Sequence, residues 1–232
     1  MAKVLYLILG AGKPVNQEKS ISLQEIFLNK TTIEHQIKLS RDAGIDLLFI
    51  SGYQDIQIRA LYPDISYIHN EDWPNTSSAY SLLIALNRFS YTDYNHNVIS
   101  YGDVLINSKI LEELVSVPNS EIKVLINSDQ PSRVSTKRLI EKIQYKDNSF
   151  EFSGVIGSNL KVIRNFHSWL KVNVLVIKNM TLSDALLLYH NFEKELIKIN
   201  IIEAKSNWAH MEHSSSLSRF AMGTKASTLA TL

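Results

Sequence analysis

A glycine loop followed by lysines is the first stretch of the chain whose residues could do chemistry. The apolar stretch 4–9 leads directly into Gly10-Ala11-Gly12, and Lys13 and Lys19 come soon after. Glycines that follow a strand let backbone N–H groups form a concave anion site and let a phosphate approach closely. A lone Gly-x-Gly is also compatible with a tight turn that binds nothing. A phosphate site is therefore the hypothesis, and a structural turn is its alternative.

Two well-known phosphate loops do not match these residues. A dinucleotide loop needs a third glycine and an acidic residue at the end of the second strand, where this chain has Ser51-Gly52-Tyr53. That absence weighs against a nicotinamide-dependent oxidoreductase. A Walker loop needs Gly-Lys followed by Ser or Thr, and Pro14 occupies that position. The loop therefore predicts a phosphate site of another kind.

A single aspartate follows another apolar stretch, in Tyr101-Gly102-Asp103-Val104. In open α/β sheets, ligands bind beyond the carboxyl ends of the strands. An aspartate placed there by a glycine turn can bind Mg²⁺, which also takes phosphate oxygens. Aspartate caps turns equally often, so both roles stay open for Asp103 on this motif alone.

A polar segment precedes an expected helix within residues 69–86. Asn70 and Trp73 come before Asn75-Thr76-Ser77-Ser78, and Ser81 lies one helical turn further on. Amides and hydroxyls beside a helix N-terminus suit hydrogen bonds to a base or a phosphate. The same residues suit helix capping, and a tryptophan suits the core, which is the more common outcome.

The elements that would position these residues alternate regularly in the first half of the chain. Strands are expected at 3–9, 47–51, 65–69, 97–101 and 122–127, and helices at about 31–43, 55–61, 78–89 and 108–114. Thr31-Thr32-Ile33-Glu34 has the pattern of a capping box, and Gly44 stands where a helix end favours a left-handed residue. Short apolar strands separated by helices predict an α/β fold, with a mixed, mostly parallel sheet covered on both faces.

The second half is less regular. A hairpin is expected from 138–145 and 149–156, around 146–148. A further strand is expected at 171–177, and a long amphipathic helix at about 182–199 with Thr181 as its N-cap. A late strand is expected at 201–205. We expect one domain over residues 1–213, followed by a small-residue-rich tail, 214–232, that is compatible with a helix.

Composition limits the classes of function. The chain has 232 residues, is 45% hydrophobic, and carries 24 basic against 23 acidic residues, so general attraction to nucleic acid or membrane surfaces is not expected. It contains no cysteine, which excludes disulfides, thiolate metal sites and a cysteine nucleophile. The apolar stretch 4–9 is too short for a signal peptide or a membrane span. A cytoplasmic protein is expected.

Taken together, these stretches resemble the nucleotidyltransferases of the sugar-phosphate and phosphocholine type. The resemblance rests on the glycine loop, a helix that opens as Thr-x-x-Glu-x-Gln, a strand that ends in Gly-Tyr, the segment 70–82, and a strand that ends in Gly-Asp. It covers most of residues 3–130 in the expected order, and implies the Rossmann-like nucleotidyltransferase fold. Near the C-terminus, Trp208-Ala209-His210-Met211-Glu212 stands where the family carries a second acidic metal ligand.

The resemblance implies an enzyme of the EC 2.7.7 type that transfers CMP from CTP to a small phosphorylated acceptor and needs Mg²⁺. Features of residues 9–14 and 218–226 resemble a bacterial capsule-modification subgroup, which implies an acceptor like phosphoglutamine, with phosphocholine as the other candidate. A homo-oligomer or a kinase-like partner is compatible with this subgroup.

The implied catalytic residues are Lys13, Lys19 and Asp103, and the implied metal ligands are Asp103 and Glu212. The implied nucleotide-binding residues are Leu9, Gly10, Ala11, Gly12, Lys13, Asn75, Thr76, Ser78, Ser81 and Gly102. Trp208, Lys161 and Arg164 are candidates for the acceptor side.

One departure from the family pattern bears on function. The family usually has an arginine after its glycine loop and a Pro-Lys pair further on, and both cations touch phosphate. This chain has no arginine after Gly12, and Ile21-Ser22 stands at the Pro-Lys position. Either Lys13 and Lys19 supply the missing charge, or the protein binds a nucleotide without efficient catalysis. A non-catalytic nucleotide-binding or regulatory domain and a sugar-1-phosphate nucleotidyltransferase are the alternatives.

Overall fold

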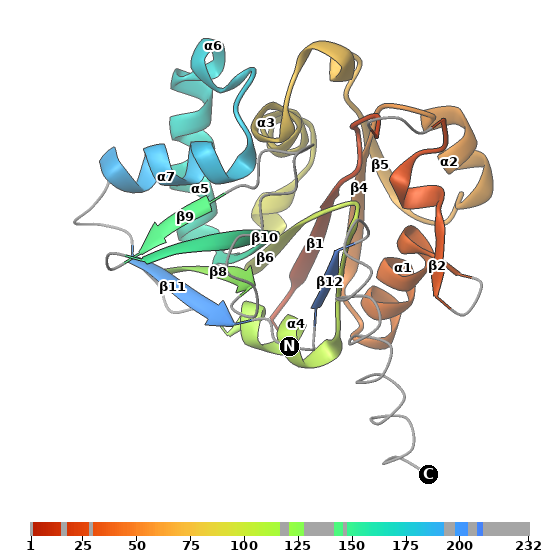
Figure 1. Ribbon diagram of the computed structural model, residues 1–232, viewed down its shortest axis with the longest axis horizontal. Coiled ribbons are helices and arrows are strands. Elements are labelled where there is room, and N and C mark those ends of the chain that lie inside the picture. Colours follow the sequence, from red (N-terminus) through yellow and green to blue (C-terminus); the bar gives the residue numbers. More distant parts are fainter. Residues whose placement is uncertain are drawn as a thin grey trace.

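A sheet of eight strands runs through the centre of the protein (Figure 1). The computed structural model describes residues 2–14, 18–27, 30–116, 121–127, 142–145, 148–192, 198–203 and 208–210. Seven strands follow the order β11-β8-β10-β6-β1-β4-β5, and β9 pairs with β10. Their bounds are β1 (Val4–Leu9), β4 (Asp46–Ser51), β5 (Ser66–His69), β6 (His96–Tyr101), β8 (Glu121–Asn127), β9 (Lys142–Tyr145), β10 (Asn148–Asn159) and β11 (Lys198–Glu203).

The sheet is mixed and mostly parallel, as predicted. Strands β6, β1, β4 and β5 are parallel neighbours, and β11 is parallel to β8. Strand β10 runs antiparallel to both β6 and β8. The predicted hairpin is confirmed, because Tyr145 of β9 pairs with Asn148 of β10. The part of its first strand before residue 142 lies outside the described residues.

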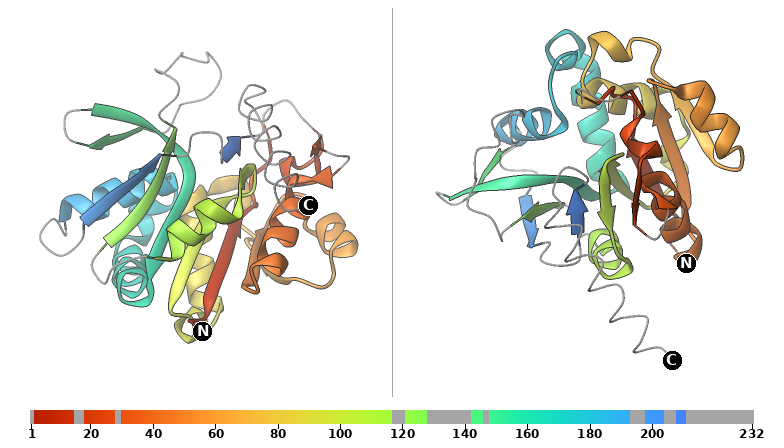
Figure 2. Two further views of the ribbon diagram at one scale, coloured as in Figure 1. Left: turned by 90° about the horizontal axis from the view of Figure 1, so that it is seen from below. Right: turned by 45° about the vertical axis from the view of Figure 1, so that its right-hand side comes forward.

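Helices cover both faces of the sheet, as the view from below in Figure 2 shows. The helices α3 (Ser78–Arg88), α5 (Leu160–Val172) and α7 (Leu182–Phe192) pack on one face. The helices α1 (Thr32–Asp42), α2 (Asp55–Leu61) and α4 (Ser108–Val115) pack on the other. Strand β1 is therefore buried on both sides, which explains why its sequence is apolar throughout.

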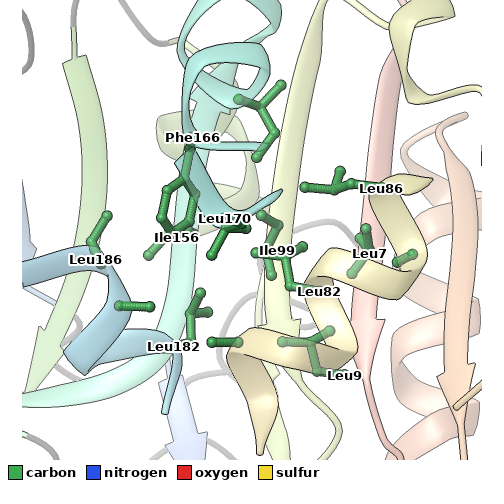
Figure 3. Close-up of a cluster of buried hydrophobic side chains, with 14 of the residues drawn as sticks. Leu7, Leu9, Leu82, Leu86, Ile99, Ile156, Phe166, Leu170, Leu182 and Leu186 are labelled. Carbon is green, nitrogen blue, oxygen red and sulfur yellow. The ribbon is translucent and has the colours of Figure 1, made fainter. Parts of the chain in front are cut away.

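The larger part of the core lies under α3, α5 and α7 (Figure 3). Leu7 and Leu9 of β1 and Ile99 of β6 face Leu82 of α3 there, while Phe166 of α5 packs over Ile156. On the opposite face, Tyr6 and Ile8 join the second cluster with residues of α1, α2 and α4. The side chains of β1 thus alternate between two cores, as the two-residue period of a strand requires.

The local signals at α1 are confirmed in detail. Thr31 is the N-cap, its Oγ1 accepts a hydrogen bond from the Glu34 amide, and the Glu34 carboxylate accepts one from the Thr31 amide. Gly44, just beyond the helix, has a φ of +62° and is in the left-handed region, as expected. Thr181 also acts as predicted, since its Oγ1 accepts a hydrogen bond from the Asp184 amide in the first turn of α7.

Two predictions in the second half are wrong. Residues 171–177 form no strand: α5 ends at Val172 and the short helix α6 spans Val174–Ile177. Several β-branched residues favoured the strand, but the buried side chains of α5 recur with a helical period and Asn159 caps the helix through its Oδ1. The long helix predicted at 182–199 ends at Phe192, because Ile199 belongs to β11 and pairs with Ile122 of β8.

Several short elements were not predicted. Strand β2 (Glu25–Phe27) pairs with β3 (Lys30–Thr31), and β7 (Val104–Ile106) pairs with β12 (Trp208–His210). The 3₁₀ turns are η1 (Ile21–Leu23), η2 (Trp73–Asn75) and η3 (Tyr91–Asp93). Glu212 and the tail 214–232 lie outside the described residues. Within the part of the chain that the structure describes, no helix combines the length and apolar character that a membrane crossing needs.

Candidate active site

The carboxyl ends of four parallel strands bring the predicted site residues to one edge of the sheet. The glycine loop follows β1, Gly52 follows β4, Asn70 follows β5, and the Gly102-Asp103 turn follows β6. Backbone hydrogen bonds join these ends, from the Tyr53 amide to the Ala11 carbonyl at 2.9 Å and from the Gly102 amide to the Leu9 carbonyl at 3.0 Å. The edge is thus one connected surface built from segments distant in sequence.

Packing requires glycine at position 10 but not at position 12. A Cβ atom at Gly10 would lie 2.2 Å from a ring carbon of Phe49, whereas one at Gly12 would have no atom within 4 Å. Gly12 is exposed, and its φ is outside the left-handed region, where the described glycines are Gly44 and Gly154. The alternative of a purely structural turn therefore accounts for the first glycine of the loop and leaves the second unexplained.

Tyr53 and Gln54 contact Lys13 and the backbone on either side of Lys19 at this edge. The Nζ of Lys13 lies 5.3 Å from the centre of the Tyr53 ring, and the Tyr53 hydroxyl donates a hydrogen bond of 2.5 Å to the Glu18 carbonyl. On the other side of Lys19, the Ser20 amide donates to Oε1 of Gln54 at 2.6 Å. The side chains of Lys13 and Lys19 themselves are exposed.

Asp103 is only 6% exposed and lies in the turn between β6 and β7. The first helix after it, α4, takes its cap from Asn107, whose Oδ1 accepts a hydrogen bond from the Ile110 amide. Strand β12 pairs with β7 so that His210 is opposite Val104, the residue next to Asp103. Glu212 follows His210 by two positions in the sequence and lies outside the described residues.

The side chain of Asn70 organises the polar segment after β5. It is fully buried, and its Nδ2 donates to Thr76 Oγ1 and to Ser81 Oγ, at 3.0 Å each. Its Oδ1 accepts a hydrogen bond of 3.1 Å from the Asp72 amide. Asn75 is exposed and donates to the Asp72 carboxylate at 2.9 Å. Asn70 thus orients the hydroxyls of Thr76 and Ser81. Contacts of these hydroxyls to a nucleotide base stay a prediction.

Ser78 joins the segment to the second half of the chain. Its Oγ accepts a hydrogen bond of 2.7 Å from the Leu182 amide at the start of α7, and lies 3.1 Å from the Tyr101 hydroxyl. Two backbone amides at the start of α3 also have partners, since those of the N-cap Ser77 and of Ala79 donate to the carbonyls of residues 178 and 180. The capping expected of Thr76 to Ser78 is thus supplied mainly by backbone of the α6–α7 connection.

An ion pair reinforces this junction. The Nζ of Lys178 lies 2.8 Å from the Asp72 carboxylate. The hydrogen bond from Lys178 holds the pKa of Asp72 below its usual value, and the same bond raises the pKa of Lys178. Both side chains are about four-tenths exposed, so the pair adds orientation more than stability.

A second charged cluster lies beside the site, at the ends of β4 and β5. Asp55 accepts hydrogen bonds from Ser51 and, at 2.6 Å, from Arg59, and His69 lies 3.6 Å away. Burial alone would raise the pKa of Asp55, but the hydrogen bonds from Ser51 and Arg59 outweigh it and lower the pKa. The cluster fixes the first turn of α2, directly after Gln54.

The acceptor-side candidates are not brought together. Asn159, at the end of β10, pairs with His96 at the amino end of β6, so Lys161 lies in the first turn of α5 at the edge of the sheet opposite Asp103. Trp208 has its backbone in β12, opposite Ile106. Trp73 is half-buried against the core and lies 5.5 Å from Tyr53, between ring centres. The position of Trp73 is explained by packing against the core, which was the alternative to a role in ligand binding.

Comparison with known proteins gives no match by sequence. No protein-family model matches the chain, and no curated protein matches it. Solved structures do match. The CTP:phosphocholine cytidylyltransferase of Streptococcus pneumoniae superimposes with a TM-score of 0.67 at 15% identity, over 95% of this chain and 98% of that one. The chain has the nucleotidyltransferase fold.

Two further solved structures agree with this assignment. The inositol-1-phosphate CTP transferase of T. maritima has a TM-score of 0.67 at 18% identity, and the match covers 96% of each chain. A putative glucose-1-phosphate thymidylyltransferase of Bacillus anthracis has a TM-score of 0.66 at 16% identity, and the match covers 94% of each chain. Identities this low establish the fold, and the Rossmann-like architecture expected from the sequence is confirmed.

Sequence reasoning missed the residues that support the site. Gln36 and Gln54 contact the backbone of residues adjacent to predicted ligand-binding residues, and Asn70 contacts the predicted hydroxyls of Thr76 and Ser81. None of these supporting contacts was expected. A usable signal existed for Gln36, because it ends the Thr-x-x-Glu-x-Gln motif but is not needed for the capping box. For Gln54 the signal is structural only, since its left-handed φ of 57° is not visible in the sequence.

Proposed function

We propose that this protein is a nucleotidyltransferase that transfers CMP from CTP to a small phosphorylated acceptor and releases pyrophosphate. One observation carries the proposal. The open, exposed Gly12, Lys13 beside Tyr53, the segment of Lys19 bonded to Tyr53 and Gln54, and the buried Asp103 all lie at the same carboxyl edge of the sheet. That arrangement supports the binding of a triphosphate together with a divalent cation.

The proposed reaction needs alignment and charge neutralisation more than acid–base chemistry. The acceptor phosphate is already an anion, so it attacks the α-phosphorus of CTP without a general base, while the bond from the α-phosphorus to the bridging oxygen breaks and pyrophosphate leaves. Backbone amides of the loop at Gly10, Ala11 and Gly12 hold the triphosphate. Lys13 and Lys19 neutralise its charge.

The residues present are compatible with Mg²⁺. A magnesium ion in a nucleotide site keeps several waters and binds one or two carboxylates plus phosphate oxygens. Asp103 supplies one carboxylate, and the pairing of β12 with β7 makes Glu212 the candidate for the second. The described residues contain no group of three or more acidic or histidine side chains, so a metal bound by protein ligands alone is not expected from them. When bound, the ion neutralises charge at the α-phosphate.

The acceptor is proposed by chemistry only. A phosphorylated head group or amino-acid side chain, like phosphocholine or phosphoglutamine, is the proposed acceptor. The first of these fits the name of the pneumococcal enzyme with the same fold. A cytoplasmic role in the modification of a capsule or another surface polysaccharide goes with this proposal.

One observation favours the alternative of a non-catalytic nucleotide-binding domain. Ser22, which stands where the related enzymes carry a lysine, is fully buried, and its Oγ lies 3.5 Å from the Gly102 carbonyl. That position therefore cannot contribute a cation to the triphosphate. Both the non-catalytic domain and the enzyme would bind a nucleotide, and only the enzyme would release pyrophosphate.

The test combines binding and turnover. Melting temperature is measured with each of the four NTPs and Mg²⁺, because a ligand that binds the native state raises it. Pyrophosphate release is then measured with CTP and a panel that contains phosphocholine, phosphoglutamine and sugar 1-phosphates. A shift with CTP and release with one acceptor support the proposal. A shift without release from any acceptor favours the non-catalytic domain, and no shift with any nucleotide overturns both.

A further inference from the structure

Gln36 of α1 connects a rigid helix to the turn that carries Asp103. The side chain is 2% exposed, and its Nε2 donates a hydrogen bond of 2.9 Å to the Val104 carbonyl and one of 3.3 Å to the Tyr101 carbonyl. These two carbonyls stand on either side of Gly102 and Asp103. A single amide group therefore holds both ends of the turn.

The amide is suited to this contact by its geometry. A glutamine nitrogen has two N–H groups in a fixed fork, and both are used when two carbonyls lie within reach. Fixing the carbonyls on both sides of a two-residue turn limits the backbone torsions of the residues between them, and so limits the direction in which the aspartate side chain leaves the backbone.

The cost of burying Gln36 indicates that the two hydrogen bonds matter. Its Oε1 is buried and has no hydrogen-bond partner among the described residues. Leaving a buried acceptor unpaired costs about 1–3 kcal/mol. A methionine or leucine would fill the same space between α1 and β7 without that cost, but would leave the carbonyls of Tyr101 and Val104 without this donor.

The helix that carries Gln36 is itself well fixed. The capping box of Thr31 and Glu34 determines where α1 begins, and Ile33 and Ile37 are buried in the core on either side of Gln36 in the sequence. Movement of Gln36 relative to the sheet would disturb this packing. The position of the turn is thus fixed by α1 as well as by β6.

The turn also contacts the loop after β1. A Cβ atom at Gly102 would lie 3.0 Å from the Cα of Gly10, and the Gly102 amide donates to the Leu9 carbonyl. A shift of the turn would therefore displace Asp103 relative to the glycine loop, and the two would no longer face a common ligand.

We propose that Gln36 is a positioning residue: its amide clasps the turn from Tyr101 to Val104 and sets the direction of the Asp103 carboxylate for a metal-bound nucleotide. The identity of the ligand rests on the proposed function. The two hydrogen bonds from Gln36 do not depend on the proposed function, because both are made within the chain itself.

The test uses Gln36→Met, which keeps the volume and removes both donors, with Gln36→Leu as a second variant if the first does not fold. The matched control is Ser40→Ala, one turn further along α1. Ser40 is also buried, but its Oγ donates to the Ile37 carbonyl within the helix and contacts neither end of the turn. Melting temperature is measured for all of them.

Three readouts follow the turn. The first is the hydrogen-exchange rate of the Asp103 and Val104 amides without ligand. The second is Mn²⁺ affinity in the presence of CTP, by water-proton relaxation. The third is the Mg²⁺ concentration that gives half-maximal pyrophosphate release. We expect faster exchange, and metal affinity weakened about tenfold or more, as for other residues that orient a ligand. Ser40→Ala is expected to change none of the three.

Unchanged exchange and Mn²⁺ affinity in a folded Gln36→Met protein overturn the proposal. Equal losses in Gln36→Met and Ser40→Ala also overturn it, because they would show a general effect on α1. Failure of the proposed function looks different: the wild-type protein would release no pyrophosphate with any nucleotide, while the exchange measurement would still separate the two variants.

Discussion

The side-chain oxygen of Gln54 accepts a hydrogen bond of 2.6 Å from the backbone amide of Ser20, which ties the start of α2 to the segment that carries Lys19. Gln54 makes this contact from a left-handed conformation, with φ of 57° and ψ of 30°. For a residue other than glycine this conformation costs about 1–2 kcal/mol. The strain is thus located directly beside the residues that are proposed to bind the triphosphate.

The first prediction separates strain from positioning at Gln54. Gln54→Gly removes the backbone strain together with the hydrogen bond to Ser20, so the free energy of unfolding should change by less than about 1 kcal/mol. CTP binding should nevertheless weaken severalfold, because the segment around Lys19 loses its hydrogen bond to the start of α2. Calorimetric titration with CTP and Mg²⁺ measures this change. Gln57→Ala, an exposed position on the same helix, is the control. An affinity equal to wild type would show that the tie is dispensable.

The second prediction concerns the lysines. Lys13→Ala and Lys19→Ala should each weaken CTP binding about tenfold, since a hydrogen bond to a charged group contributes roughly 1.5–3 kcal/mol. The loss should shrink at high salt, where exposed charges are screened. Lys3→Ala is a matched control: Lys3 lies just before β1, and its Nζ is 5.2 Å from the centre of the Tyr94 ring, much as Lys13 lies over Tyr53. If neither site variant binds CTP more weakly than the control, the loop is structural.

Much of the fold could be predicted because its strands carry a local signal. Strand β1 is buried on both faces, so its whole sequence is apolar, and Thr31 with Glu34 marks the start of α1 within four residues. The edge on which the site lies then follows from parallel strand direction alone. The glycine loop and Gly102-Asp103 were accordingly found from sequence.

The parts that could not be predicted depend on contacts between distant residues. Gln36 reaches the Val104 carbonyl 68 positions away, and nothing in its neighbourhood indicates that partner. The strand expected at 171–177 was wrong, because α5 ends at Val172 and α6 spans Val174–Ile177; Val172 and Val176 are both exposed on these helices. Ile199 was predicted to end a long helix, but it pairs with a residue of β8 as part of a parallel strand, and the local sequence does not indicate that partner.

The third prediction is a pH dependence of stability that arises at His167. Its Nδ1 lies 2.9 Å from the Tyr91 hydroxyl and its Nε2 lies 2.9 Å from Oδ1 of Asn87. Burial, with a smaller effect of Lys171, lowers the pKa of His167 to about 4. Between about pH 6.5 and pH 4 the unfolded chain therefore binds a proton that the folded chain does not, so stability should fall as the pH falls through this window.

The size of this effect can be measured with a variant that does not titrate. The slope from one proton is at most about 1.4 kcal/mol per pH unit. His167→Gln retains hydrogen-bonding groups and should lose this part of the slope, while other groups keep theirs. Urea unfolding of both proteins at pH 7 and pH 5 gives the difference. The same loss of stability in wild type and variant would show that His167 does not carry the dependence.

The last prediction tests the metal-binding role of Asp103. Asp103→Asn keeps the size of the side chain and removes its negative charge, so Mg²⁺-dependent pyrophosphate release should fall by at least about a hundredfold if the carboxylate holds the ion at the α-phosphate. CTP binding without metal should change little, because the loop amides and lysines remain. The control is Asp46→Asn at the opposite edge of the sheet, where the Asp46 carboxylate accepts a hydrogen bond from Tyr94 at 2.8 Å. Asp46→Asn should alter melting temperature more than turnover. Near-normal turnover in a folded Asp103→Asn protein would show that Asp103 is not a metal ligand, and the aspartate at the end of β6 would then have no role in the proposed reaction.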